Sequence, residues 1–211
     1  MPRNLSEQDI AGFRDRLCDV AERQFALQGA ESVTIRQLAA ALGVSPMTPY
    51  RYFRDKDAIL AAVRARAFDR HAEALERAYA ENAGHPDRRA RAILEAYVDF
   101  AMSNPEAYKL MFDIHHPTEA EHPDLVRAGT RSRATMTQHL QDRIAAGVTI
   151  GDPERVAHMF WAAIHGPLML HFSGMLGPGQ DARALINDLV AALGRAIFDQ
   201  PPAARPAAGA P

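Results

Sequence analysis

The sequence has a single cysteine, Cys18, among its 211 residues. This scarcity excludes an internal disulfide and favours a reducing compartment. Long hydrophobic runs are also missing: none approaches the roughly 20 apolar residues of a membrane-spanning helix, and the first residues lack the apolar core of a signal peptide. Because 47% of the residues are nevertheless hydrophobic, we expect a soluble, cytoplasmic globular protein with no membrane partner.

The short motifs of common catalytic sites are missing as well. The sequence contains no GxSxG nucleophile turn, no phosphate-cradling glycine loop and no HExxH zinc motif. Its nine histidines raise a metal-sensing alternative. However, His158 and His165 are seven residues apart, about 10.5 Å along a regular helix, which is too far for both to bind one ion. We therefore predict no metal site, no cofactor and no enzymatic activity.

Neither sign of charge dominates the whole chain, whose net charge is −2. Between Thr34 and Arg70, however, there are seven basic residues and three acidic ones, so the rest of the chain carries an acidic excess. This asymmetry indicates a DNA-binding segment on a body that DNA repels. An ordinary solvated helix face would give the same count.

Residues 34–56 predict two short helices joined by a tight turn. Thr34 is a favourable N-cap, and Gln37 can complete a capping box with it. Gly43 suits the left-handed conformation that ends a helix, and Ser45, which precedes a proline, begins another. The apolar stripe of the first helix consists of Ile35, Leu38, Ala39 and Leu42. The pattern is typical of a helix-turn-helix motif.

The second helix of the motif, drawn over residues 46–53, has two distinct faces at about 100° per residue. The inward face carries Pro46, Pro49 and Phe53. The outward face carries Met47, Thr48, Arg51 and Arg54, with Tyr50 and Tyr52 on the flanks. Eight residues span about 12 Å, which matches the roughly 12 Å width of the DNA major groove. We therefore predict that the outward face enters this groove.

The remaining pattern is helical throughout. Ser6 with Asp9 predicts the start of a first helix that Gly29 ends, and Asp55 predicts the cap of a helix that continues towards Tyr79. Further helices are expected around 93–101, from 104, over 123–146, from 152 and over 181–198, with loops at 115–123 and 174–179. The predicted fold is all-α, with a flexible N-terminus (1–5), a three-helix helix-turn-helix DNA-binding head (6–65), a helical ligand-binding, regulatory and dimerisation domain (66–199) and a disordered tail (200–211).

The helix-turn-helix segment resembles the DNA-binding motif of the tetracycline-repressor (TetR) family of bacterial transcription regulators. The matching residues are Phe25, Gly29, Thr34, Ile35, Leu38, Ala39, Leu42, Gly43, Val44, Ser45, Tyr50, Tyr52, Phe53 and Lys56. The resemblance implies phosphate contacts from Thr34, Tyr50, Tyr52 and Lys56. It implies base contacts from Met47, Thr48 and Arg51. The predicted DNA-binding set also includes Arg36, Ser45 and Pro46.

Two C-terminal segments are unusually apolar. Residues 153–173 are apolar nearly all round, which predicts burial on both sides, and Pro167 should kink this helix near His165. Residues 181–198 have one broad apolar stripe, so two copies of the pair could form a four-helix interface. Burial within a monomer is the alternative. The TetR resemblance implies the homodimer, which would read a palindromic operator in double-stranded DNA.

Trp161, His165 and Gly166, with residues 104–108 and 111–112, resemble a regulatory domain of some TetR-like proteins that is known for its Trp, His and Gly. Methionine and aromatic side chains in this region suit a small, mostly apolar effector, although the same residues could simply form core. The candidate ligand-binding residues are Tyr97, Ala101, Met111, Phe112, His115, Met136, Trp161, His165 and Met169.

Together these features predict a ligand-responsive transcriptional repressor that binds its operator as a homodimer and is released by a small effector. An activator, or a DNA-binding protein that needs no inducer, is the alternative within the same class. A helical small-molecule-binding protein or enzyme that uses the histidines of the second domain is the alternative from a different class.

Overall fold

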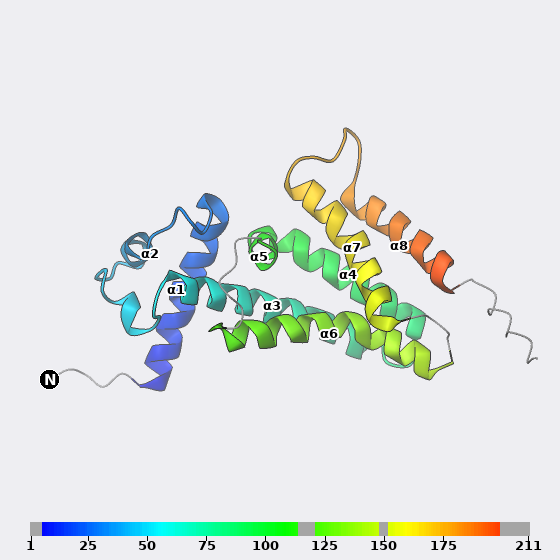
Figure 1. The fold of residues 1–211 in the computed structure, drawn as a ribbon, viewed down its shortest axis with the longest axis horizontal. Helices are drawn as coiled ribbons and strands as arrows, with labels where there is room; N and C mark the ends of the chain where they lie inside the picture. The colour runs from blue at the N-terminus through cyan, green and yellow to red at the C-terminus, as the bar shows by residue number, and fades with distance from the viewer. Residues whose placement is uncertain (1–5, 114–120, 148–151, 199–211) are drawn as a thin grey trace, which may run out of the picture. The chain divides into compact units, whose positions relative to one another are not determined.

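The computed structural model describes residues 6–113, 121–147 and 152–198. Within these ranges the chain forms helices and turns and no strand, which confirms the predicted all-α fold (Figure 1). The elements are α1 (Glu7–Gln28), α2 (Ile35–Ala41), η1 (Pro49–Arg51), α3 (Lys56–Glu81), α4 (Pro86–Ser103), α5 (Pro105–Met111), α6 (Pro123–Ala145), α7 (Pro153–Phe172) and α8 (Ala182–Phe198). None of the helices in these ranges combines the length and the apolar character that a membrane span requires.

The helices pack as two compact units, each built from two stretches of the chain. The first unit contains the residues up to Arg77 together with Asp99–Arg133. The second contains Ala78–Val98 and the residues from Ala134 onwards. Helices α3, α4 and α6 therefore each contribute residues to both units.

The predicted functional borders stay predictions, because they concern roles rather than packing. The predicted head covers residues 6–65 and the predicted regulatory domain 66–199, whereas α3 continues through that border without interruption. The predicted flexible N-terminus (1–5), the tail (200–211) and most of the predicted loop at 115–123 lie outside the described residues.

Local sequence sets the ends of the first two helices as predicted. Both begin with a complete capping box, Ser6 with Asp9 in α1 and Thr34 with Gln37 in α2. Gly29 ends α1 with a φ of 79°, a value that glycine adopts more readily than residues with a Cβ. These short-range hydrogen bonds satisfy backbone donors that the first turn of a helix leaves without partners.

The segment between α2 and α3 differs from the prediction. Instead of an α-helix over residues 46–53, only Pro49–Arg51 is helical, as the short 3-10 helix η1. The reason is that Pro49 has no N–H for the carbonyl of Ser45, which accepts a hydrogen bond from the nearer N–H of Thr48 instead (2.8 Å). A bond that spans three residues rather than four tightens the backbone here.

This change moves one predicted core residue to the surface. Pro46 lies in the turn before η1 and is exposed, because helical spacing has not yet begun at that position. Pro49 and Phe53 are buried as predicted. Asp55 also caps α3 as predicted, since its Oδ1 accepts a hydrogen bond from the backbone N–H of Ala58 (2.8 Å).

The residues that follow η1 pack against α1 in the core of the first unit. The ring of Tyr52 stacks on Phe13 with ring centroids 4.2 Å apart. Arg14 donates a hydrogen bond to the carbonyl of Tyr52 (2.7 Å) and lies over the ring of Phe53. Helix α5 packs on α1 and adds Leu110 to the same apolar cluster. The three-helix head is therefore completed by a fourth helix from later in the sequence.

An ion-pair cluster joins α3 to α6 within the first unit. Arg131 donates to Glu76 at 2.6 Å and to Asp69 at 3.1 Å, and Arg127 adds two further bonds to Asp69. These guanidinium groups, Arg127 first, hold the pKa of Asp69 below its usual value. Nearby, Nδ1 of the buried His71 lies 2.9 Å from the hydroxyl of Ser132. The two helices are thus held together by polar as well as apolar contacts.

In the second unit, α7 and α8 lie side by side (Figure 1). The predicted burial of α7 on both sides is wrong for the single chain, because its neighbours cover only one side. The buried residues of α7 are Val156, Ala157, Ile164, Pro167 and Leu168. Met159 and Leu170 on α7 are 39% and 41% exposed, and Leu189 on α8 is 38% exposed. The kink predicted at Pro167 stays a prediction.

Candidate functional site

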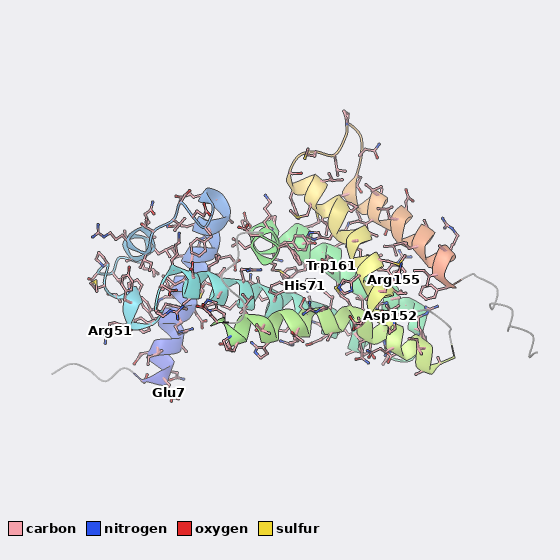
Figure 2. The ribbon with its side chains drawn as sticks, viewed as in Figure 1. Glu7, Arg51, His71, Asp152, Arg155 and Trp161 are labelled. Carbon is pink, nitrogen blue, oxygen red and sulfur yellow. The ribbon has the colours of Figure 1, made fainter. Side chains whose placement is uncertain are left out.

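The surface around η1 presents several of the side chains that were predicted to contact DNA. Met47 is 68% exposed and Tyr50 is 49% exposed. Arg51 is exposed at the periphery of the head (Figure 2), whereas Thr48 is half-buried. Ser45 and Pro46 are exposed as well. Their assignment as DNA contacts stays a prediction, and all of them except Thr48 are exposed.

The predicted phosphate-binding residues have internal contacts as well. The hydroxyl of Thr34 accepts a hydrogen bond from the backbone N–H of Gln37 at 3.3 Å. The ammonium group of Lys56 donates to the carbonyls of Ala30 and Glu31 at 2.8 and 3.1 Å. The Tyr52 ring is half-buried and packs against the core. These residues therefore shape the head, whatever contacts they make with DNA.

The basic excess of the segment 34–70 is smaller at the surface than in the sequence. Five of its seven basic side chains donate to a carboxylate or a backbone carbonyl of the same unit. The five are Arg54, Lys56, Arg64, Arg66 and Arg70. Among the described residues, the side chains of Arg36 and Arg51 have no hydrogen-bond or ion-pair partner, and both are exposed. These two arginines are consequently the cations of the segment that are most available to a nucleic acid.

A second feature is a cavity of about 170 Å³ within the second unit. Helices α4, α6, α7 and α8 all contribute to its walls. The apolar part of the lining includes Ile93, Leu94, Leu140, Phe160, Ile164 and Phe198. The polar part consists of Tyr97, His139, Arg143 and Trp161. An apolar cavity of about 150 Å³ is large enough to hold benzene, so this one has room for a small organic molecule.

Three of the predicted ligand-binding residues line this cavity, namely Tyr97, Met136 and Trp161. Trp161, on α7 (Figure 2), donates a hydrogen bond from its indole N–H to the hydroxyl of Tyr97 (3.1 Å). His165 packs beside Trp161 with ring centroids 5.7 Å apart, and Met169 is half-buried on the same helix. Neither of them belongs to the cavity lining.

Three other predicted ligand-binding residues belong to the first unit instead. Ala101 is fully buried there. The backbone carbonyl of Met111 accepts a hydrogen bond from Arg64, and the ring of Phe112 meets Tyr108 edge to face. They are separated from the cavity residues because α4 crosses from the second unit into the first after Val98. His115 lies outside the described residues.

Sequence reasoning missed two polar residues of the cavity, His139 and Arg143. The signal was present, since Met136, His139, Leu140 and Arg143 follow the spacing of one helix face. Burial lowers the pKa of His139 to about 4, and the positive charge of Arg143 acts in the same direction. The imidazole is therefore neutral at pH 7, and Arg143 supplies the positive charge of the lining.

Comparison with known families identifies both parts of the chain. Residues 17–63 match the model of bacterial regulatory proteins of the tetR family, and residues 90–193 match that of the tetracyclin repressor-like C-terminal domain. The HTH-type transcriptional repressor Rv1474c of Mycobacterium tuberculosis is 36% identical over 77 residues, which are 36% of this chain and 41% of that protein. The chain spans about half the length of the curated relatives it matches.

Solved structures show the same fold over most of the chain. A protein of unknown function from Rhodococcus sp. RHA1 has 31% sequence identity and a TM-score of 0.76, with 94% of this chain and 99% of that chain covered. The TetR family transcriptional regulator PfmR of Thermus thermophilus has 21% identity and a TM-score of 0.65, with 85% and 97% covered. The latter likeness concerns the fold. Because family models match both its N-terminal and its C-terminal regions, the chain belongs to the tetR family of bacterial regulatory proteins.

Proposed function

We propose that the protein is a ligand-responsive repressor that acts in the cytoplasm, binds a palindromic operator as a homodimer and leaves the DNA when a small, mostly apolar effector fills the cavity. The observation that carries this proposal is the occurrence of an apolar cavity and a DNA-binding head in one chain. The name of the relative Rv1474c, a transcriptional repressor, supports the sign of regulation. The resemblance of Trp161, His165 and Gly166 to the Trp-His-Gly type of regulatory domain remains part of the proposal.

Arg36 and Arg51 are the cations on which DNA binding should depend most. Neither is engaged by a described residue, so each can meet DNA without breaking an internal contact. Arg36, on α2, is suited to a phosphate. Arg51, on η1, is suited to a base edge, as arginine pairs with guanine in the major groove.

Replacing these arginines should therefore have different effects on DNA binding. Arg36→Ala should weaken binding to all sequences alike and reduce the dependence of log K on log salt by about one. Arg51→Ala should cost about 1–3 kcal/mol on the operator and less on unrelated DNA. Fluorescence anisotropy at several KCl concentrations measures both, with an operator selected from random duplexes.

Arg77→Ala is the matched control for this pair. Arg77 is exposed near the far end of α3, about 30 Å along the helix from Lys56. Its replacement should therefore change neither the affinity for DNA nor the salt dependence of that affinity. Wild-type affinity in the Arg36→Ala/Arg51→Ala double variant would disprove the proposed reading surface.

The proposed homodimer uses the apolar faces that α7 and α8 leave uncovered. On α7 the exposed Met159 and Leu170 flank Ala162 and Gly166, at the spacing of one helix face. On α8 the exposed Leu189 continues such a face. A second copy of the chain would remove these side chains from water, with small residues allowing the helices to approach closely.

The proposed route from effector to DNA uses α6 and α3. The C-terminal half of α6 lines the cavity with His139, Leu140 and Arg143, and its N-terminal half is bound to α3 through the ion pairs of Arg127 and Arg131. Helix α3 begins at the head. To shift the protein from about 99% to about 1% DNA-competent, the effector must favour the released state by about 5.5 kcal/mol.

Filling the cavity should abolish the effector response and preserve DNA binding. Gly194 lies in the wall on α8, and a Cβ added there would meet no atom within 4 Å. Gly194→Leu should therefore occupy the cavity without a clash at its Cβ. Operator release is measured across a metabolite panel. Gly129→Leu, on α6 and outside the lining, is the control, and a Gly194→Leu variant that responds like the wild type would contradict the proposed effector site.

A further inference from the structure

We propose that the ligand of this cavity is a small apolar carboxylic acid in its ionised form, whose carboxylate is held by Arg143 and His139. This inference rests on the proposed function and names the chemical class of the effector. Its basis is the distribution of polar atoms around the cavity.

The cavity lining has few polar side chains, and the charge among them is positive. Arg143 lines the cavity, and no aspartate or glutamate is found among the described residues of the lining. His139 and Arg143 are four residues apart on α6, so their side chains leave the helix on the same side. The aliphatic and aromatic walls on the other helices offer no charge. A ligand that fills this space thus meets mainly apolar surface and a single cationic side chain.

A buried nitrogen of His139 independently indicates that the ligand places a polar atom in this cavity. Its Nδ1 is buried, and it has no hydrogen-bond partner among the described residues. A buried nitrogen without a partner costs free energy, and native proteins rarely leave one. Because the imidazole is neutral at pH 7, it can donate one N–H to an acceptor oxygen without adding a second charge. A carboxylate held beside Arg143 would give this imidazole a hydrogen-bond partner.

The nearest acidic side chain on α6 is already engaged elsewhere. Asp142 accepts hydrogen bonds from Arg89 at 2.8 Å and from the hydroxyl of Tyr79. Its carboxylate does not line the cavity. The guanidinium carbon of Arg143 lies 4.6 Å from the centroid of the Phe198 ring. This contact places the guanidinium group against an aromatic side chain of the lining, and a guanidinium group can bind a carboxylate through two of its N–H donors.

The volume of the cavity limits the apolar part of the ligand. At about 170 Å³, the space slightly exceeds the roughly 150 Å³ that holds benzene. The apolar part should therefore be one aromatic ring or a short alkyl chain. Octanoate and 3-phenylpropanoate are suitable probes, and their amides are nearly isosteric controls that lack the charge.

Binding can be measured by the fluorescence of Trp161, which is the single tryptophan of the chain and lines the cavity. The full-length protein should bind each acid at least about tenfold more tightly than its amide. Arg143→Gln should weaken binding of the acid about 10- to 100-fold, the loss of one charged hydrogen bond, and leave amide binding unchanged. Arg143→Lys, which keeps the positive charge, should restore part of the difference in affinity between each acid and its amide. Arg88→Gln, an exposed arginine on α4 outside the lining, is the matched control.

The comparison of acid with amide in the wild type tests the proposal even if a variant fails to fold. Equal binding of acids and amides, or no binding of either acid up to millimolar concentration, would overturn it. A parallel measurement of operator release separates the two levels of inference. Acids that bind through Arg143 without releasing DNA would sustain the ligand class and refute effector-driven release. Uncharged molecules that bind in the cavity and release DNA where acids do not would refute the ligand class and support effector-driven release.

Discussion

Leu189→Arg should convert the protein from a dimer to a monomer and lower its operator affinity by about 100- to 10,000-fold. Leu189 lies on the uncovered face of α8 and is 38% exposed in the single chain. At the centre of a symmetric helix pair, two arginines would face each other without water or counter-charge, so association should fail. Each head would then bind one half-site alone, and the gain from linked binding, about 100- to 10,000-fold, would be lost.

Light scattering gives the mass, and anisotropy on full and half operators gives the affinity. Val126→Arg is a matched control, because Val126 is also partly exposed, at 43%, but lies on α6 outside the α7 and α8 faces. It should leave both the mass and the operator affinity unchanged. A dimeric Leu189→Arg variant with wild-type affinity would exclude the proposed interface.

The free energy of unfolding should fall by about 2 kcal/mol between pH 7 and pH 5 because of His71 alone. Burial lowers the pKa of this histidine from 6.5 to about 3. The unfolded chain therefore binds a proton in the window between these values while the native protein does not. The stability is fully present above about pH 6.5 and is lost progressively as the pH falls towards 3. His139, whose pKa is lowered to about 4, adds a loss of the same sign.

Urea unfolding at pH 7, 6 and 5, at one fixed protein concentration, measures this dependence. His71→Gln keeps a polar side chain near Ser132 but cannot titrate. Its free energy of unfolding should therefore fall by about 2 kcal/mol less between pH 7 and pH 5 than that of the wild type. His85→Gln, at an exposed position, should leave the dependence unchanged. Identical pH dependence in the wild type and His71→Gln would show that His71 does not account for the loss.

Features that depend on neighbouring residues could be predicted from the sequence. The capping boxes at Ser6 and Thr34, the end of α1 at Gly29 and the cap at Asp55 each need only a few adjacent side chains and backbone groups. The all-α fold follows from the same local chemistry, repeated along the chain. The length of η1 was missed, because two prolines within four residues change which backbone bonds can form.

Features that depend on packing across the chain were only partly predictable. The spacing of Tyr97 and Trp161 gave no sign that their side chains would meet, and nothing local places Ala101 in a different unit from Tyr97. Arg143 was missed because an arginine on a helix is usually exposed to solvent, and only the packing of α4, α7 and α8 against α6 makes it part of a cavity wall. Which face of α7 is exposed depends on how the neighbouring helices pack against it. The periodicity of the sequence alone does not reveal this packing.

The place of α5 in the core of the head limits how far the head can be exchanged as a separate module. Leu110 belongs to the same apolar cluster as residues of α1, α2 and α3, and the carbonyl of Met111 is a partner of the buried Arg64. A chimera joined after residue 65 would pair this head with a foreign helix in that position. Exchange of DNA specificity between relatives should therefore carry α5 along with the head, or replace η1 alone within an otherwise intact chain.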